Sequence, residues 1–440
     1  MLINCYRPDF CVKLVKCGKL SRNEEKMSSC DDVNLTRGLL PLEQAMSQML
    51  AYIDCVEGYD EVPLSQCDGL ILAVDLKSNI DVPPFDNSAM DGYAFAHQSL
   101  HSTTNLQQVG TVFAGSPCHG TVETGQCVRI MTGAKLPKGC DTVIMQEYAQ
   151  VTGEQVSFKR AVACGANVRS LGEEFSQGQQ VMEQGTVLSP RHIALLASLG
   201  FASVPVRQKL KVAIFSTGDE LTPLGQPLAE GQIYDSNRYA LVSMLAKLPV
   251  EIIDYGVIAD NPDEIRATFL QADTEANVVI SSGGVSVGEA DFTRDILQEL
   301  GDINFWKLAI KPGKPIAFGR LSQSVFFGLP GNPVSAMVTF YKLAKPAILA
   351  MAGAQVLQPI SLQAKLTHDL GKSVGRQDFQ RGILVTNALG ELEVTSTGQQ
   401  SSSMMGSMCL ANCFIVLPRE QGKVCAGETV TVELFDSCLN

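Results

Sequence analysis

Residues 277–300 read NVVISSGGVSVGEADFTRDILQEL, and the character of the sequence changes twice within them. The first part is a short apolar run, which is typical of a buried strand. Two glycines follow at positions 283 and 284, and the last part, DFTRDILQEL, places apolar residues at helical spacing. The order of strand, glycine-rich loop and helix is that of one unit of an α/β fold.

Three further segments repeat this order. The runs KVAIFS (211–216), EIIDYGVI (251–258) and SVFFGL (324–329) lead into TGDEL, ADNPDEIRATFLQA and PGNPVSAMVTFYKLA. Parallel strands need helical crossovers, so four such units predict a parallel sheet covered by helices. Two of the helices are expected to begin at Asn261 and Asn332, each of which can cap its helix and is followed by a proline.

The rest of the chain shows other patterns. An amphipathic helix is expected over 42–53, and short alternating segments broken by Gly and Pro over 109–184 predict a β-rich region. After residue 355 no helical pattern lasts, and five or so short strands predict a small barrel or sandwich. We therefore expect a multidomain α/β plus β protein with a three-layer α/β domain (208–354), an inserted β-rich domain (59–169), a helical and extended linker domain (31–58 and 170–207) and a C-terminal β-barrel domain (355–440).

The composition is that of a folded chain of several domains, with 440 residues of which 45% are hydrophobic and 18% charged. Uninterrupted apolar runs stay below about 18 residues, so we expect no membrane span. A formal net charge of −12 disfavours nucleic acid and anionic membranes as partners, because the summed field would repel both. The 14 cysteines are scattered and the first 26 residues lack the features of a secretion signal, so we expect a reduced, cytoplasmic protein.

Donors for an anion stand after the third predicted strand. Ligands of open parallel sheets bind beyond the carboxyl ends of the strands, where helix N-termini point donors at anions. Gly283 and Gly284 allow backbone N–H groups to approach a phosphate closely, while Ser282 and Ser286 add hydroxyl donors. The segment therefore predicts a phosphate-binding loop.

Three acidic residues, Glu220, Asp260 and Asp291, stand at matching places after the first three strands. Carboxylates crowded beside phosphate donors would repel the phosphate unless a cation lies between them, so we expect Mg²⁺ held by these three oxygen ligands. The alternative is that each acid only favours the start of a helix through the macrodipole.

The segment FWKLAIKPGKP (305–315) contains the single tryptophan and three lysines, Lys307, Lys311 and Lys314. Its Pro and Gly residues exclude a regular helix, so we expect a stiff turn that fixes positive charge in an acidic protein. The alternative is a solvated basic loop.

The segment PPFDNSAMDGYAF (83–95) sets two carboxylates, Asp86 and Asp91, in a rigid and partly apolar loop. Asp, Asn, Ser, Gly and Pro are common in surface turns, which is the simplest interpretation and the one we keep for Asp86. A stiff loop can also hold an acid in a fixed position for catalysis, and we assign that role to Asp91.

Six motifs, PPFDNSAMDGYA, RIMTGA, FSTGDEL, SSGGVSVGEADF, KPGKPIAFG and GLPGNPVSA, occur in this order. In order and spacing they resemble the molybdopterin molybdenumtransferase family, the MoeA proteins of molybdenum cofactor biosynthesis. The resemblance runs from about Leu39 to the C-terminus. Residues 1–30 lie outside it, and residues 1–26 are expected to be a dispensable extension or an upstream start.

The resemblance implies an elongated homodimer of four-domain subunits whose active cleft lies between the α/β domain and the partner's β-rich domain. The implied reaction converts adenylylated molybdopterin and molybdate, with Mg²⁺, to molybdenum cofactor and AMP. Further partners to expect are the adenylyltransferase and molybdoenzyme chaperones. The motif positions matched as catalytic are Asp91, Thr132, Glu220, Asp260, Asp291, Lys307 and Lys311. Those matched as substrate-binding are Ser282, Gly283, Gly284, Ser286, Lys314, Asn332, Pro333, Ser335, Arg376, Arg381 and Ser402.

Two positions depart from the family pattern, and two other functions are open. Glu174 stands where relatives often carry Asp, and Ser401 replaces a common Gly, so the local geometry at both is an open point. A molybdopterin adenylyltransferase would share the SSGG and PGNP loops but would not need PPFDNSAMDGYA or the β-barrel. A pterin-binding scaffold without turnover is expected if the acids are structural.

Overall fold

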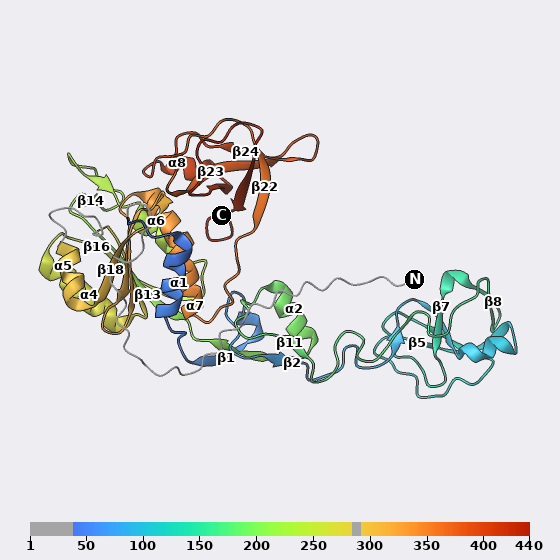
Figure 1. Ribbon diagram of the computed structural model, residues 1–440. Coiled ribbons are helices and arrows are strands. Elements are labelled where there is room, and N and C mark those ends of the chain that lie inside the picture. Colours follow the sequence, from blue (N-terminus) through green and yellow to red (C-terminus); the bar gives the residue numbers. More distant parts are fainter. Residues whose placement is uncertain (1–37, 284–291) are drawn as a thin grey trace.

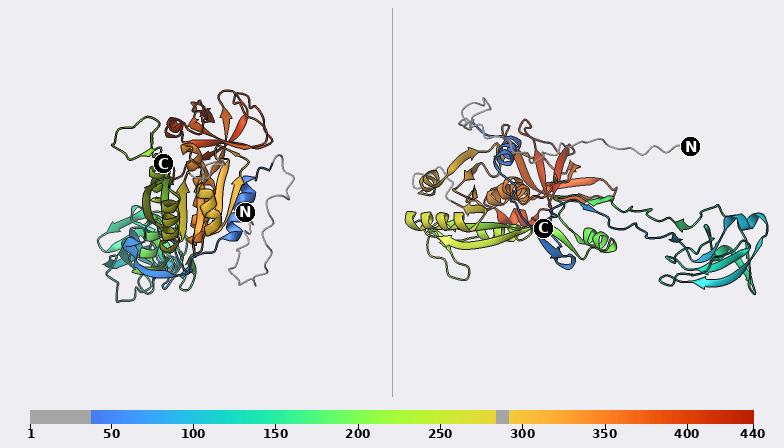
Figure 2. Two further views of the ribbon diagram at one scale, coloured as in Figure 1. Left: turned by 90° about the vertical axis from the view of Figure 1, so that its left-hand side faces the viewer. Right: turned by 90° about the horizontal axis from the view of Figure 1, so that it is seen from below.

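The computed structural model describes residues 38–283 and 292–440 of the chain. The molecule is elongated, with an α/β body at one end and a β-rich body at the other (Figures 1 and 2). A C-terminal barrel packs against the α/β body, and a small linker body lies between the two ends. The multidomain α/β plus β architecture predicted from the sequence is confirmed.

The α/β body is built on a six-stranded sheet in the order β16-β13-β17-β21-β20-β18. Its first four strands pair in parallel, as the sequence predicts. The last two, β20 and β18, are antiparallel, and this hairpin edge was not predicted because it contains no helical crossover. The strands are β16 (Val250–Ile258), β13 (Leu210–Thr217), β17 (Val278–Ser282), β21 (Val325–Leu329), β20 (Pro315–Arg320) and β18 (Asp302–Lys307).

Helices cover both faces of this sheet, which is why its strands are apolar on both sides. Val212 and Ile214 of β13 pack toward one face, while Ala213 and Phe215 pack toward the other. Helices α4 and α5 cover the second face, and α1, α3, α6 and α7 cover the first (Figure 1). The helices are α1 (Leu42–Tyr52), α3 (Asn237–Leu245), α4 (Pro262–Glu275), α5 (Phe292–Leu300), α6 (Pro333–Thr339) and α7 (Lys345–Met351).

The two predicted helix caps behave differently. The side chain of Asn261 accepts hydrogen bonds from the backbone N–H groups of Asp263 (2.9 Å) and Glu264 (3.4 Å), so this cap is confirmed. Asn332 occupies the N-cap position of α6, but its side chain makes no capping bond. The exposed amide of Asn332 therefore stays available to a ligand.

Helices α6 and α7 are joined by a π-helical turn, η4 (Phe340–Ala344), into one long apolar helix. By length and composition, Pro333–Met351 is the one helix of the described chain that could cross a membrane. However, 72% of its apolar window is buried inside the fold. A core helix of a folded domain can have the same length and composition, and Pro333–Met351 is such a core helix of the α/β body.

The C-terminal region forms a closed barrel. Strand β23 pairs with both β24 and β25, which closes the order β23-β24-β22-β26-β25 onto itself. The open choice between barrel and sandwich is thereby decided, while the short helix α8 (Met405–Leu410) was not predicted. The strands are β22 (Ser361–Leu366), β23 (Gln377–Thr386), β24 (Leu392–Ser396), β25 (Cys413–Leu417) and β26 (Thr429–Leu434).

The barrel is joined to the α/β body by side chains and by backbone. Lys342 of η4 pairs with Glu433 of β26, and Lys345 of α7 pairs with Asp436. Strand β19 (Ile310–Lys311), which follows β18, pairs in parallel with β23. One segment of the α/β body thus extends the barrel's sheet.

The linker body consists of two small antiparallel pairs and one helix around its own apolar core. Strand β1 (Tyr59–Pro63) pairs with β12 (Ser203–Arg207), and β2 (Leu76–Lys77) pairs with β11 (Gln180–Met182). The helix is α2 (Pro190–Ser198), and a short turn, η1 (Leu64–Gln66), packs nearby.

The β-rich body is a six-stranded sheet in the order β7-β4-β6-β5-β9-β8, with an apolar cluster on each face. Two extended segments connect it to the linker body, and Figure 2 shows it well separated from the α/β body. Its sheet strands are β4 (Gly92–Phe95), β5 (Asn105–Val112), β6 (Gln126–Ile130), β7 (Thr142–Met145), β8 (Ala149–Thr152) and β9 (Gln155–Phe158). Smaller elements of the chain are β3 (Asn87–Ser88), β10 (Val168–Arg169), β14 (Leu221–Thr222), β15 (Ile233–Tyr234), η2 (His97–His101) and η3 (Gln146–Tyr148).

Candidate functional site

The carboxyl edge of the α/β sheet is defined by strand register. Thr217 lies opposite Ile258, and Ser282 lies between Ser216 and Leu329. The loops that follow β13, β16, β17 and β21 therefore emerge side by side, as ligand-binding loops do in open α/β sheets.

The first two loops, which carry Glu220 and Asp260, contact each other at this edge. The backbone N–H of Asp260 donates to Asp219 Oδ1 at 3.0 Å. Gly218 has a φ of +144°, a backbone conformation that residues with a Cβ rarely adopt, and this favours glycine here. The carboxylate of Glu220 lies close over the Gly218 backbone.

The predicted magnesium site can be traced only in part. Glu220 and Asp260 both expose carboxylates, the hard oxygen donors that Mg²⁺ prefers. Asp291 lies outside the described residues, as do Gly284 and Ser286. Within residues 38–283 and 292–440, no group of three or more His, Cys, Asp or Glu side chains is arranged to hold a metal ion. The two placed acids fit a magnesium ion in donor type.

Ser282 and Gly283 form the centre of the edge. Ser282 is buried, and its Oγ accepts a hydrogen bond of 2.9 Å from Asn237 Nδ2. Gly283 has a φ of +93°, and a Cβ there would lie 3.0 Å from the carbonyl oxygen of Thr217. The close approach of the two loops explains why a glycine follows the serine.

The PGNP loop brings the barrel to the same edge. The backbone N–H of Val334, in the first turn of α6, donates to the carbonyl oxygen of Ser402 at 3.0 Å. Pro333 opens the helix and Ser335 is buried one turn inside. Ser402 of the barrel is thus held beside Asn332 and the start of α6.

The three lysines lie farther along the sheet. Lys307 ends β18 opposite Pro315, and β18 runs parallel to β21 because both are antiparallel to β20. Lys307 is therefore at the carboxyl edge, three strand spacings or about 14 Å from Ser282. The prediction of a turn over this whole segment is wrong, because Lys307 ends a strand and Lys311 lies in β19. Lys314 is exposed just after them.

A group of cations surrounds one buried acid at the joint between sheet and barrel. Lys311 Nζ lies 4.0 Å from Asp378 Oδ2, whose side chain is 3% exposed. Burial raises the pKa of Asp378, and the nearby Lys311, Lys372 and Arg376 oppose that rise. Three cations facing one carboxylate leave a local excess of positive charge, which suits an oxyanion.

Arg381 has a different environment from the one its substrate-binding assignment suggests. Its side chain is fully buried, and its donors reach Ser407 Oγ (3.0 Å) and the carbonyl oxygens of Gln399, Gln400 and Ser401 (3.4, 3.4 and 2.9 Å). Burial lowers its pKa to about 10. In this structure Arg381 holds the loop that carries Ser402, and direct binding of substrate by Arg381 stays a prediction.

Asp91 and Thr132 contact each other in the β-rich body. Asp91 Oδ1 accepts hydrogen bonds from the backbone N–H and from the hydroxyl of Thr132, both at 2.7 Å. These bonds lower the pKa of Asp91, which is an exposed residue. The pair belongs to the body that Figure 2 places far from the α/β sheet of the same chain.

Three residues of this edge were not singled out from the sequence. Asn237 follows Asp235 and Ser236, a pattern typical of a helix start, so it did not stand out as a site residue. Lys372 and Asp378 flank Arg376, and this nearness in sequence was the available signal. Glu174 and Ser401, the two departures from the family pattern, are both exposed. The hydroxyl of Ser401 lies 3.1 Å from that of Ser403.

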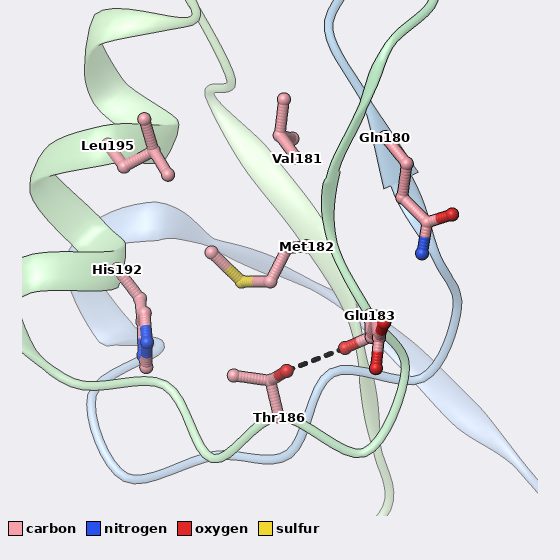
Figure 3. Close-up of a pocket in the computed structure, with 7 residues that line it drawn as sticks. All are labelled: Gln180, Val181, Met182, Glu183, Thr186, His192 and Leu195. Carbon is pink, nitrogen blue, oxygen red and sulfur yellow. Dashed lines mark hydrogen bonds between the residues drawn. The ribbon is translucent and has the colours of Figure 1, made fainter. Parts of the chain in front are cut away.

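A separate groove of about 500 Å³ lies in the linker body (Figure 3). The predicted site residues do not line it. Its polar rim includes Glu183, whose carbonyl oxygen accepts from Thr186 Oγ1 at 2.7 Å, and His192, whose Nδ1 accepts from the backbone N–H of Ser189 at 3.2 Å. The Thr186–Glu183 bond closes a turn and the Ser189–His192 bond caps α2, so the local fold explains both contacts.

Comparison with known proteins agrees with this geometry. Residues 40–200 match the MoeA N-terminal region (domains I and II), 213–350 a probable molybdopterin binding domain, and 363–435 the MoeA C-terminal region (domain IV). The molybdopterin molybdenumtransferase of Haemophilus influenzae is 47% identical over 403 residues, which cover 91% of this chain and 100% of that protein. The chain belongs to the molybdopterin molybdenumtransferase (MoeA) family.

Two other members of the MoeA family support the assignment. The molybdopterin molybdenumtransferase of a Nostoc species is 35% identical over 86% of this chain and 89% of its own. The crystal structure of a molybdopterin biosynthesis MoeA protein from Pyrococcus horikoshii OT3 superposes with a TM-score of 0.78 at 31% identity, covering 90% of this chain and 100% of that one. The family's sequence and fold thus extend over all four bodies of this chain.

Proposed function

We propose that this protein inserts molybdenum from molybdate into adenylylated molybdopterin, releasing AMP and forming molybdenum cofactor. The observation that carries the proposal is the layout of the carboxyl edge. Acids and hydroxyl donors lie on the loops beside Ser282, Lys307 lies about 14 Å away across the strands, and the cations around Asp378 lie at the joint with the barrel. A long substrate with phosphates at one end of the edge and a small oxyanion at the other matches both charge patterns.

The roles we assign follow the position of each group. Ser282 and Gly283 face the phosphate of the pterin, with Asn332 and Ser335 at the neighbouring helix start. Lys307, Lys311 and Arg376 attract molybdate, which otherwise would be repelled by a protein of net charge −12. Ser402, held by its bond to Val334, places the barrel's loop beside Asn332 at the phosphate end of the edge.

Mg²⁺ is the cation we propose for the acidic end of the edge. Glu220 and Asp260 would hold it, with Asp291 as a third ligand. When bound, the ion would neutralise phosphate charge, which the carboxylates alone would repel. We expect chelation to abolish turnover and added Mg²⁺ to restore it, and full activity after exhaustive chelation would contradict the assignment.

The subunits are proposed to form a homodimer with shared sites. Asp91 and Thr132 sit in the body that lies far from the sheet of their own chain, so a second subunit is the simplest way to bring them to the edge. The remaining proposals are a cytoplasmic location, contact with the adenylyltransferase and with molybdoenzyme chaperones, and no nucleic-acid or membrane partner.

The proposal is tested by molybdate-dependent release of AMP. Purified protein is mixed with adenylylated molybdopterin and Mg²⁺, with and without molybdate, and AMP is quantified. We expect release only with molybdate and no consumption of ATP. A non-catalytic scaffold would release none, and an adenylyltransferase would consume ATP with unmodified molybdopterin, so either result would overturn the assignment.

A further inference from the structure

Asn237 connects three segments at the carboxyl edge. It is the first residue of α3, and its Nδ2 donates to Ser282 Oγ (2.9 Å) at the end of β17. The same Nδ2 donates to the carbonyl oxygen of Gly331 (2.7 Å) in the PGNP loop. Both hydrogens of the amide are therefore used, one on each of the two loops assigned to the substrate.

The bond to Ser282 determines where the serine hydroxyl can point. A hydroxyl has one hydrogen to donate, and here Oγ already acts as an acceptor. Ser282 is 3% exposed, and no acceptor for its hydrogen lies among the residues that the structure describes. The O–H is left to donate away from Asn237, toward an acceptor that is not part of the described chain.

Unpartnered polar atoms around this point also indicate a ligand. Asn237 Oδ1 is buried without a hydrogen-bond partner, and so is the hydroxyl of Ser216, which lies opposite Ser282 on the neighbouring strand β13. Ser216 is 1% exposed. Buried polar atoms usually have partners, so two without one on the same face of this edge need an explanation.

We propose that Asn237 is a positioning residue for the pterin substrate. It orients the Ser282 hydroxyl so that this group donates to a phosphate oxygen of the substrate. Its bond to the carbonyl oxygen of Gly331 holds the PGNP loop next to Ser282. Its role is to act through Ser282 and not on molybdate. The inference rests on the proposed function, because that function supplies the phosphate.

The test uses Asn237→Asp, which keeps the shape of the side chain but removes both donors. An acid at the start of a helix is favoured by the macrodipole, so α3 should not be weakened by the added charge. We expect the Kd and KM for adenylylated molybdopterin to rise at least about tenfold, because Ser282 loses the donor that orients it and the new carboxylate repels the phosphate; the uncharged alanine variants below isolate the first effect. The KM for molybdate should not change.

The double variant separates positioning from independent binding. If Asn237 acts in part through Ser282, then Asn237→Ala combined with Ser282→Ala loses less pterin affinity than the sum of the two single losses, and what remains beyond Ser282→Ala reports the bond to Gly331. Additive losses in the double variant would overturn the inference, as would wild-type binding by Asn237→Asp.

Two controls keep the outcome unambiguous. Asn412→Asp removes an amide donor in the barrel, where Nδ2 bonds to the carbonyl oxygen of Leu384 (2.9 Å), and it should leave pterin binding unchanged. Thermal midpoints of all variants show whether folding is retained. Equilibrium binding of adenylylated molybdopterin needs no turnover, so failure of the proposed function would appear as an inactive wild-type protein, while the coupling of Asn237 to Ser282 would still be measured.

Discussion

Asp91 is held by Thr132 through two hydrogen bonds to one carboxylate oxygen, and this pair links two motifs that lie about forty residues apart. The sequence predicted each residue as part of a site, but not their contact, because nothing in either motif encodes the partner. The bonds stabilise the ionised carboxylate and lower the pKa of Asp91. A residue held in the charged form suits a carboxylate that must stay ionised to attract a cation or a hydrogen-bond donor.

We expect Thr132→Val to move the acidic limb of the pH–rate profile to higher pH. The substitution removes the hydroxyl donor and keeps the backbone N–H, so the pKa of Asp91 rises part of the way to its ordinary value. An enzyme that needs Asp91 ionised then loses activity at a higher pH as the solution is acidified. Thr132→Ser, which keeps both donors, should match the wild type, and an unshifted profile in Thr132→Val would argue against an ionised Asp91.

Lys311→Gln tests the cluster of cations around Asp378. Glutamine retains much of the length but not the charge, so molybdate binding should weaken by about 1.5–3 kcal/mol, the range for a lost charge-assisted hydrogen bond. The loss should shrink as salt is added, because Lys311 is partly exposed. Lys365→Gln, which removes an exposed lysine of the barrel, is the control. Equal molybdate affinity in Lys311→Gln and the wild type at low salt would show that this lysine is merely solvated.

At the scale of elements, the joint between the π-turn η4 and strand β26 fixes the barrel on the α/β body. Lys342 has a 7% exposed side chain, pairs with Glu433, and places Nζ 4.6 Å from the ring centre of Phe379. Burial and the neighbouring Lys345 lower the pKa of Lys342 to about 7, and the nearby Asp436 opposes that shift. This pair joins the barrel to the same long helix whose first turn bonds to Ser402.

We predict that Glu433→Gln lowers the free energy of unfolding by about 3–5 kcal/mol at pH 6, because an uncompensated ammonium stays buried. The deficit should shrink as the pH rises toward about 7 and stay level above it, because folded wild-type Lys342 is then neutral as well and its ion pair with Glu433 is lost. Chemical denaturation at several pH values measures both effects. Glu391→Gln breaks an exposed pair with Lys365 and should cost far less stability than Glu433→Gln. Equal small losses in the two variants would mean that the joint contributes little.

The elements themselves were largely predictable, because each follows from a local pattern. The four parallel strands, the helix Leu42–Tyr52 and the five barrel strands all have clear periodicity, and Asn261 caps its helix as predicted. The antiparallel pair β18–β20 and the two-residue strand β19 were missed. Their segment is rich in Pro and Gly, so its strands are set by pairing with the sheet and barrel and not by local preference.

At the scale of the whole molecule, the order of motifs identified the family, but distances between bodies could not be derived from the sequence. The strand register explains why Glu220, Asp260 and Ser282 share one edge. The separation of Asp91 and Thr132 from that edge follows from the two long connecting segments, whose direction no local pattern specifies (Figure 2). That separation is the strongest reason to expect that two subunits build one site.

The measurement that tests this account most directly is the activity of mixed subunits. Asp91→Asn removes the acid of the β-rich body, and Glu220→Gln removes an acid of the sheet edge, so each variant should be inactive alone. After the two are unfolded together and refolded at equal amounts, random pairing gives hybrids with one intact site, and molybdate-dependent AMP release should recover to about a quarter of the wild-type level. If the mixture stays as inactive as the separate variants while hybrid dimers are present, the carboxyl edge and the Asp91–Thr132 pair do not act on the same substrate, and the account is wrong.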